Sequence, residues 1–354
     1  MAIVSIAQAH DPLRVVVGVD THKNSHVGHA KDVLGRDLGH LEIPTTVRGY
    51  AALMAWARGF GEVTAFGVEG TSSYGIGLAR YLQGEGQLVL EVIRPGRQDR
   101  RFRGKSDPLD AEAAAAAVLS GKARHLPRAS GEKVEMIRAL RIARTSATKA
   151  RTQAINAIKA LIVMAPEPVR CGLRDLPTAR LVNTCAHFRT PRIDDPTSAT
   201  KAALRSLALR YQALAAEVRE LEVQLDRLTS ETDPLLRSRF GVGPDSAAAL
   251  LLAAGDNPAR LRSDSSFSML CGASPLLASS GQTNRHRLNR GGDRQANSAL
   301  HRIVMARLRW HEPTQAYMRK RTAEGKSKPE VIRCLKRYVA REIYTVLMSA
   351  RGQA

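Results

Sequence analysis

The chain has 354 residues, of which 44% are hydrophobic. That length and apolar content are enough for two or three domains with their own cores, so wholesale disorder is excluded. Its 54 lysines and arginines outnumber 33 aspartates and glutamates, which gives a formal net charge of +21. Such an excess favours a partner that carries many phosphates, with nucleic acid ahead of a ribosomal or an anionic membrane surface.

The cysteines and the apolar segments restrict the class of protein further. The four cysteines form no CxxC pair and have no histidine at zinc-finger spacing, which argues against a disulfide framework and a structural zinc. The N-terminus lacks the pattern of a signal peptide, and no apolar run reaches the roughly 18 residues that a membrane helix needs. We therefore expect a cytoplasmic protein that has no membrane partner.

The first part of the chain, residues 13–125, alternates between strand and helix patterns. Strands are expected at 14–20, 26–32, 37–43, 63–69 and 88–93, and helices at 47–59, 74–82 and 108–120. The resulting order βββαβαβα is that of a ribonuclease H-like α/β domain. We therefore predict this fold class for the N-terminal domain.

The middle part, residues 131–232, is dominated by two long helices. The first, at 132–164, has an alanine-rich seam (Met136, Leu140, Ala143, Ala147, Ala150, Ala154, Ala157, Leu161), and the second begins near Ser198. The second seam (Leu204, Leu207, Tyr211, Leu214, Val218, Leu221, Leu225, Leu228) alternates steps of three and four over four heptads, which is typical of a coiled coil. Its partner is either the first helix or another copy of the chain. Prolines suggest an irregular insertion at 166–197.

The last part, residues 233–350, is expected to form a mostly α C-terminal domain. Loops rich in serine and glycine occupy 263–293, and helical patterns resume at 296–310 and 329–348.

Four carboxylates stand at element ends in the N-terminal part. Asp20 ends the first strand, Glu69 ends the fourth, and Asp107 and Asp110 open a helix. Strands one and four are neighbours in a ribonuclease H-like sheet, so the acids should converge. Anions so close together would repel one another and take up protons unless divalent cations neutralised them. Oxygen ligands favour Mg²⁺ or Mn²⁺, two of which can activate a phosphodiester.

Each acid also has a simpler interpretation. Asp107 before Pro108 fits a helix N-cap with proline at the first helical position, and Asp110 would stabilise the helix dipole. Asp20 and Glu69 could be turn residues at strand ends. Their joint arrangement favours a metal site.

A basic segment precedes Asp107. Six of the twelve residues at 94–105 are basic: Arg94, Arg97, Arg100, Arg101, Arg103 and Lys105. Charge runs are often only solvated surface, but this one ends at the acids, where it could hold a phosphate backbone.

Three N-terminal motifs resemble a known family. Gly18-Val-Asp-Thr-His-Lys23, Val68-Glu-Gly-Thr-Ser-Ser-Tyr74 and Lys105-Ser-Asp-Pro-Leu-Asp-Ala111 resemble the DEDD transposases of the insertion-sequence-110 type. These proteins have a RuvC-like N-terminal domain and include Piv-type DNA invertases among their relatives. The segments 241–244, 271–275, 279–281 and 290–294 resemble the same family's C-terminal transposase domain.

The resemblance implies a second catalytic element in the C-terminal domain. The family's catalytic serine maps onto Ser280, with Ser279 as the weaker candidate, although Ser-Ser-Gly alone is a common loop tripeptide. Attack on phosphorus would give a phosphoserine link that conserves bond energy for rejoining. Arg285, Arg287 and Arg290 could hold the scissile phosphate. The spacing from Ser280 to the Gly-Gly-Asp at 291–293 is slightly shorter than in the family.

The expected activity is therefore DNA transposition or site-specific recombination. The acids of one protomer and Ser280 of another would form a composite site in a homo-oligomer, a dimer or tetramer held by the long helices. The resemblance further implies a structured bridge RNA that pairs with donor and target DNA, and a place on the prokaryotic nucleoid. Two alternatives stay open: a RuvC-like nuclease that uses water, and an inactive nucleic-acid-binding copy.

Overall fold

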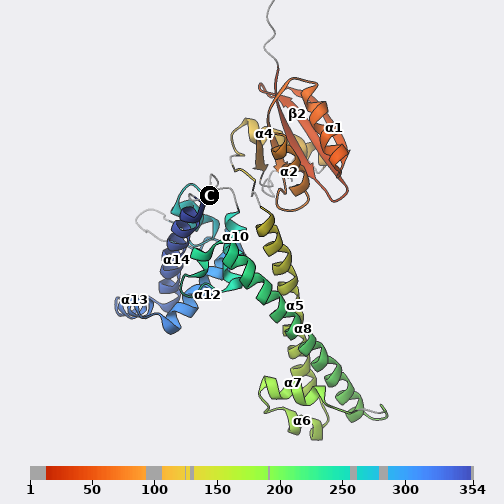
Figure 1. Ribbon diagram of the computed structural model, residues 1–354, viewed down its shortest axis with the longest axis vertical. Helices are drawn as coiled ribbons and strands as arrows, with labels where there is room; N and C mark the ends of the chain where they lie inside the picture. The colour runs from red at the N-terminus through yellow and green to blue at the C-terminus, as the bar shows by residue number, and fades with distance from the viewer. Residues whose placement is uncertain are drawn as a thin grey trace, which may run out of the picture. The chain divides into compact units, whose positions relative to one another are not determined.

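The computed structural model describes residues 13–92, 106–123, 125–127, 131–189, 192–255, 261–278 and 286–351. The chain divides into two compact units, Met1–Ala129 and Ser130–Ala354 (Figure 1). The first unit is a mixed α/β domain, and the second is built almost entirely from helices.

The first unit contains a five-stranded sheet in the order β3-β2-β1-β4-β5. Its elements are β1 (Arg14–Thr21), β2 (Ser25–Asp32), β3 (Asp37–Pro44), α1 (Val47–Arg58), β4 (Glu62–Glu69), α2 (Ile76–Gly84), β5 (Val89–Val92) and α4 (Asp107–Leu119). Strand β2 runs antiparallel to β1 and β3, whereas β4 runs parallel to β1 and β5. This arrangement confirms the predicted α/β fold class and is consistent with a RuvC-like domain.

The two faces of the sheet are covered by different helices. Val15, Val17 and Val19 of β1 pack with Leu53 of α1 and Leu78 of α2 in one core. Because side chains alternate along a strand, Gly18 and Asp20 point to the opposite face. The helix α4 covers that face, where its backbone contacts Gly18.

Two glycines let α4 lie close to the sheet. A Cβ atom on Gly18 would stand 2.1 Å from both the Ala111 carbonyl oxygen and the Ala115 amide nitrogen. One on Gly67 of β4 would stand 2.5 Å from Val118. The small residues on both surfaces therefore set the helix position, and the start of α4 comes to lie beside the end of β1.

We expect Gly18→Ala to lower the free energy of unfolding of the first unit by about 1–3 kcal/mol, because the new methyl group would overpack the contact with α4. Gly84→Ala is the matched control, since a Cβ there meets nothing within 4 Å; we expect no loss and a gain of up to about 1 kcal/mol. Urea unfolding would be followed by Trp56 fluorescence in a Trp310→Phe background. Equal stabilities of the two alanine variants would contradict the close packing of α4.

The second unit begins with a hairpin of two long helices, α5 (Glu132–Val163) and α8 (Pro196–Thr232). They pack along their length in antiparallel order, since Ile137 shares a core with Leu225, and Ile158 shares another with Leu204. The predicted α8 seam thus faces α5 of the same chain. In α5 the buried face is shifted from the predicted seam near both ends: Ile137 is buried where Met136 was predicted and is exposed, and Ile158 and Ile162 are more buried than Ala157 and Leu161, although Leu161 still packs against the core. Positions that repeat every 3.5 residues rotate gradually around a straight helix of 3.6 residues per turn, so the buried face leaves the predicted seam toward the helix ends. In addition, the two ends of α5 pack in different cores, which select different residues for burial.

The segment 166–197 is not the irregular insertion that the prolines suggested. It forms α6 (Glu167–Leu173) and α7 (Thr178–Ala186), whose buried side chains join Ile158 and Leu204 in one core. Pro166 and Pro177 stand at the N-caps of these helices. Proline is tolerated at a helix start because the first amides need no intrahelical acceptor, so these prolines begin helices and do not exclude them.

The rest of the second unit surrounds α10 (Pro244–Ala254), which is buried from Ser246 to Ala254. Of the other helices, α9 (Pro234–Arg237) and α12 (Arg294–Trp310) contact α10. The helix α14 (Lys328–Arg351) packs on α12 and on α11 (Asp264–Leu270), and α13 (Glu312–Ala323) packs on α12 and α14. A short hairpin of β6 (Leu276–Leu277) and β7 (His286–Arg287) is attached. The prediction of continuous loops over 263–293 therefore missed α11 and this hairpin, although Ser263 caps α11 with a capping box.

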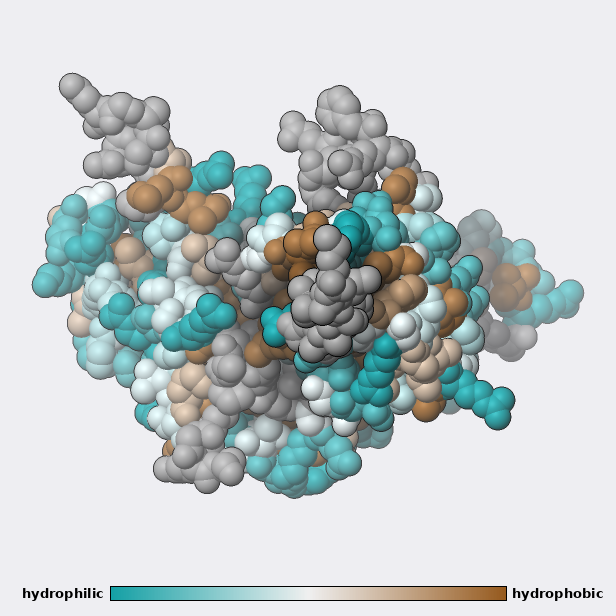
Figure 2. All heavy atoms as spheres, turned by 90° about the horizontal axis from the view of Figure 1, so that it is seen from above, coloured by the Kyte–Doolittle hydropathy of each residue, from teal (hydrophilic) through white to brown (hydrophobic). Residues whose placement is uncertain are grey.

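Exposed apolar side chains are scattered over the surface. The face in Figure 2 mixes hydrophilic and hydrophobic side chains. Exposed residues such as Leu34, Val163 and Trp310 lie in the β2–β3 turn, in α5 and in α12. Among the described residues, none of the helices is long and apolar enough to cross a membrane.

Candidate functional site

An acid cluster forms where β1 ends and α4 begins. Asp20 lies at the carboxyl end of β1 on the α4 face, and its side chain is almost completely buried. The α4 helix starts with Ser106 as N-cap and Asp107 as its first residue, followed by Pro108. Asp107 is therefore not the N-cap that the simpler interpretation required. One helical turn separates Asp107 from Ala111, which contacts Gly18, so Asp107 is brought close to Asp20.

His22 links the two carboxylates of this cluster. Its Nε2 atom lies 3.0 Å from Oδ2 of Asp20 and 3.3 Å from Oδ1 of Asp107. The other oxygen of Asp20 accepts the backbone N–H of Thr21 at 2.9 Å. The three potential ligand atoms all lie within 4.8 Å of one another, the one such group found among the described residues.

Glu69 and Asp110 lie near this cluster but are not members of that group of three. Glu69 ends β4, next to β1, and is buried; its carbonyl oxygen accepts the Thr21 hydroxyl at 3.0 Å. Glu69 follows Gly67 by two residues, so it points to the α4 face, as Asp20 does. Asp110 stands in the first turn of α4, three residues after Asp107. The structure thus places Asp20 and Glu69 at the carboxyl ends of two neighbouring strands and Asp107 and Asp110 in the first turn of α4, with Asp20 and Asp107 in contact with His22.

The sequence motifs assign no role to His22. The signal for it was available, because His22 stands two residues after Asp20 and both leave the same end of β1. On β1 alone, His22 has one neighbouring carboxylate, that of Asp20. The sequence therefore predicts His22 as a metal ligand only when Asp107 on α4 is known to lie beside it.

The donor set of the cluster fits a divalent cation. It supplies two carboxylates and one imidazole from a backbone that α4 and the sheet hold in place. Carboxylate oxygens are the ligands that Mg²⁺ and Mn²⁺ prefer. The side chain of Asp20 is 4% exposed, whereas those of His22 and Asp107 are 40% and 47% exposed. A cation held here would therefore face solvent on one side, where a phosphate oxygen could reach it.

Several predicted nucleic-acid contacts lie outside the described residues. These are Arg94, Arg97, Arg100, Arg101, Arg103, Lys105 and Arg285, together with Ser279 and Ser280. Arg287 and Arg290 are described and exposed, and both line a hollow of about 500 Å³ beside the β6–β7 hairpin.

The residues on either side of the 279–285 segment are held by the helical core. Leu276 pairs with Arg287 in the hairpin. The Asp293 amide donates to the Leu270 carbonyl at 2.6 Å. A Cβ atom on Gly292 would stand 2.3 Å from the Gly272 amide nitrogen, so only glycine fits this approach. The Gly-Gly-Asp turn of residues 291–293, which follows β7, therefore packs against residues 270–272, which precede β6.

A second anchor comes from α12 and α14. The Asn297 amide group donates to the carbonyls of Cys271 and Gly272 at 2.8 and 3.0 Å, and its oxygen accepts from Lys336 at 2.8 Å. Burial and the neighbouring Arg333 lower the pKa of Lys336. These contacts fix the turn that leads into β6.

The comparisons with known proteins agree with the sequence motifs. A family model described as Transposase, of the DEDD IS110 type, matches residues 17–165, which include Asp20, Glu69, Asp107 and Asp110. A second model, described as Transposase IS116/IS110/IS902 family, matches residues 233–319, which include Ser280. Together they cover about two thirds of the chain. No curated relative matches it at a significant level. The chain therefore belongs to the IS110 family of transposases, enzymes that cut and rejoin DNA.

Proposed function

We propose that this transposase recombines the DNA of an insertion sequence with a divalent metal at its acid cluster and a serine nucleophile in its C-terminal unit. The metal ligands would be Asp20, Glu69, Asp107 and Asp110, the nucleophile Ser280, and the ion Mg²⁺ or Mn²⁺. The observation that carries the proposal is the cluster of Asp20, His22 and Asp107, whose ligand atoms lie within 4.8 Å of one another.

The geometry of the cluster supports a metal better than it supports capping alone. Asp20 is buried, and Asp107 lies at the exposed start of α4, facing the same imidazole. Two carboxylates this close repel unless a positive charge lies between them. A bound divalent cation would polarise the scissile phosphodiester and stabilise the charge on its attacking and leaving oxygens. Asp20 and Asp107 would hold the cation. His22 would either bind the cation with them or turn outward and leave both carboxylates free to bind it.

The proposed serine step conserves the energy of the phosphodiester. The Ser280 oxygen would form a bond to phosphorus while the bond from phosphorus to the leaving DNA oxygen breaks. The hydroxyl proton would pass to a base and the leaving oxygen would take up a proton. Attack by a DNA hydroxyl on the phosphoserine would reverse these changes and rejoin the strand. Arg285, Arg287 and Arg290 would hold the phosphate, which is supported for Arg287 and Arg290 by their exposure beside the hairpin.

The assembly is part of the proposal. The acids of one protomer and Ser280 of another would form a composite site in a dimer or tetramer, and a bridge RNA would pair with donor and target DNA. The formal net charge of +21 is compatible with binding both nucleic acids. Protein expressed with its flanking element should carry a discrete RNA species, and protein without one would contradict the guided mechanism.

Removal of metal should abolish recombination of a plasmid-borne element that carries its native flanks. We expect no product in excess EDTA and full recovery when Mg²⁺ or Mn²⁺ is restored, because phosphoryl transfer here depends on charge stabilisation by the ion. Product formation would be measured by quantitative amplification of the new junctions. Undiminished recombination in EDTA would refute the metal site.

The metal should also stabilise the fold. Ligands that bind only the native state raise its stability by an amount that grows with their concentration. The melting temperature of the wild-type protein should therefore rise with Mn²⁺, and this readout is independent of activity. A RuvC-like nuclease that uses water would share both metal effects, but it would form no covalent protein–DNA intermediate.

A further inference from the structure

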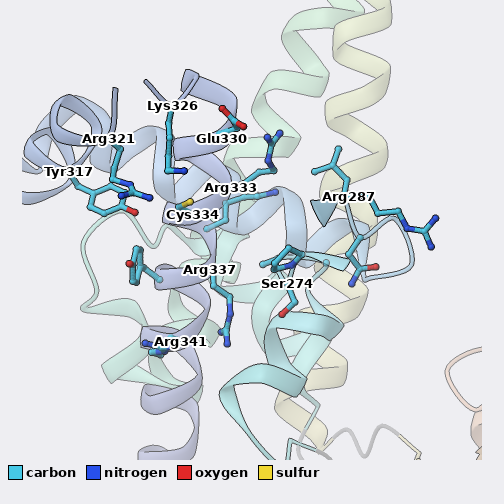
Figure 3. Close-up of a pocket in the computed structure, with 17 residues that line it drawn as sticks. Ser274, Arg287, Tyr317, Arg321, Lys326, Glu330, Arg333, Cys334, Arg337 and Arg341 are labelled. Carbon is cyan, nitrogen blue, oxygen red and sulfur yellow. The ribbon is translucent and has the colours of Figure 1, made fainter. Parts of the chain in front are cut away.

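The second unit contains a cavity of about 1050 Å³. Its lining shares the 272–275 turn with the sequence motifs and Arg287 with the proposed phosphate contacts, whereas its walls on α13 and α14 have no role in the proposed chemistry. It lies between α13, α14, the turn at 272–275 and the residues that follow β7 (Figure 3). The lining includes Ser274, Arg287, Tyr317, Lys326, Arg333 and Tyr338. We call it the basic cavity.

One face of α14 supplies most of the positive charge. Arg333, Arg337 and Arg341 recur every four residues and follow one another along this helix in Figure 3. The opposite face, which includes Val331 and Leu335, is buried in the core of the unit. The basic face of α14 is thus held against the cavity by the packing of its apolar face.

The positive charge of the cavity is only partly neutralised. Its lining holds seven basic residues and one acid, Glu330. Arg337 and Arg341 pair with Asp264, which lowers the pKa of that carboxyl, and Arg321 pairs with Glu324. Within the part of the chain that the structure describes, Arg287, Lys326 and Arg333 form no ion pair within 4 Å, although the charges of Arg333 and Lys326 help the Ser327 hydrogen bonds to lower the pKa of Glu330. Glu330 therefore balances part of the charge of these two cations and leaves an excess of positive charge in the cavity. A polyanion would supply the missing counter-charge.

Two aromatic rings stand in the same cavity. Tyr338 is 53% exposed and meets Tyr317 edge to face, with ring centroids 5.5 Å apart. Arg321 lies over the Tyr317 ring at 5.9 Å. Burial raises the pKa of Tyr317 to about 12, so its phenol stays neutral. A rigid aromatic pair among arginines is the pattern that binds single strands, because each unstacked base offers a ring face and each phosphate a charge.

We propose that the basic cavity binds an unpaired segment of a nucleic-acid strand, with a base stacked on Tyr338 and adjoining phosphates held by Arg333, Lys326 and Arg287. This inference rests on the proposed function, because it requires that the enzyme acts on nucleic acid. It adds a second binding site, which recognises a strand whose bases are unpaired. A duplex offers phosphates but keeps its bases stacked on one another, so it cannot use the tyrosine.

The test measures binding of the full chain to fluorescent oligonucleotides in EDTA, where no cleavage occurs. Single-stranded DNA, single-stranded RNA of the same sequence, and the corresponding duplex DNA are compared by anisotropy. Failure of the metal or serine chemistry would leave this binding unchanged, so the two proposals fail separately. Tighter binding of RNA or of DNA identifies the strand, and equal binding shows that the shared base and phosphate suffice.

Tyr338→Leu should weaken single-strand binding by about 5-fold to 100-fold, the range expected for one stacked base, and leave duplex binding unchanged. Tyr338→Phe should restore it, since the ring face remains. Equal losses for single strand and duplex, or no loss with leucine, would overturn the proposal.

Arg333→Gln should weaken binding several-fold and reduce the salt dependence by about one phosphate contact. Arg219→Gln is the matched control, because Arg219 is exposed on α8 and does not line the cavity. As a direct readout, a strand containing 5-iodouracil should photo-crosslink to the peptide with Tyr338 in the wild type. Equal effects of the two arginine substitutions, or crosslinks confined to other peptides, would place the strand elsewhere.

Discussion

Asp20→Asn should lower the rate of DNA strand cleavage by about 10²-fold to 10³-fold or more, which corresponds to about 3–4 kcal/mol of lost transition-state stabilisation. The substitution keeps the shape of the side chain but removes the charge that would hold a metal ion. Cleavage would be measured with full-length protein and a plasmid-borne element under saturating Mg²⁺. A rate within a factor of two of the wild type would rule out Asp20 as a ligand.

The fold should survive this substitution. The Thr21 amide can still donate to the carboxamide oxygen, and His22 can accept from the new amide group. Removing one of two neighbouring anions also reduces repulsion with Asp107, so we expect the metal-free melting temperature to stay equal or rise. The increase of that temperature with Mn²⁺ should disappear. Glu85→Gln, which removes an exposed acid in the same unit, should retain both the rate and the metal effect.

Glu69→Gln and Asp110→Asn test how far the site extends beyond the three-residue cluster. Glu69 ends β4, the strand next to β1, and Asp110 lies in the first turn of α4, three residues after Asp107. Losses comparable to that of Asp20→Asn would support a site of four acids. Near-normal rates in both variants would restrict the site to Asp20, His22 and Asp107.

Ser280→Ala should abolish the covalent protein–DNA adduct that we expect for the wild type. Wild-type protein stalled on a nicked or suicide substrate should form an adduct that resists denaturant and maps to the peptide with Ser279 and Ser280. The alanine removes the attacking oxygen and leaves the acid cluster and the basic surface unchanged. DNA binding should therefore persist while joining is lost, the pattern expected when a group needed only in the transition state is removed.

Ser279→Ala is the matched control for the nucleophile. The two serines are adjacent, and a single backbone arrangement directs only one of two such side chains into a site, so this variant should keep most of the adduct. Loss of the adduct in Ser279→Ala with retention in Ser280→Ala would move the assignment by one residue. Retention in both variants would favour hydrolysis by water, as in a RuvC-like nuclease.

The sequence predicts the N-terminal sheet well because its signals are local. The continuous apolar run Val15-Val-Val-Gly-Val19 marks β1, and the acid that follows marks its end. Pro108 similarly predicts the start of α4, although the sequence suggested Asp107 as the N-cap and the structure has Ser106 there. Where local signals compete, the sequence is less informative: the prolines near 166 and 177 are compatible with loops and with helix starts, and only packing against Ile158 and Leu204 selects helices.

The α8 seam shows a second limit. Leu204, Val218 and Leu225 predict that one face of the helix is covered, but the same period suits a helix of the same chain and one of another copy. Packing of α5 against this face in the structure identifies one partner. The identity of a partner depends on contacts between residues far apart in the sequence, which a periodic pattern does not encode.

The sequence by itself determined the family, the order of strands and helices along the N-terminal domain, and the acids at the ends of β1 and β4 and at the start of α4, because each depends on a short motif or a local period. Only the tertiary structure decided that His22 lies between Asp20 and Asp107, since this requires α4 to approach β1 over Gly18. It alone also assembled the basic cavity, whose walls come from the 272–275 turn, the end of β7, α13 and α14. Those walls meet because the apolar faces of the helices share one core, and folding around that core places basic residues side by side that the sequence keeps apart.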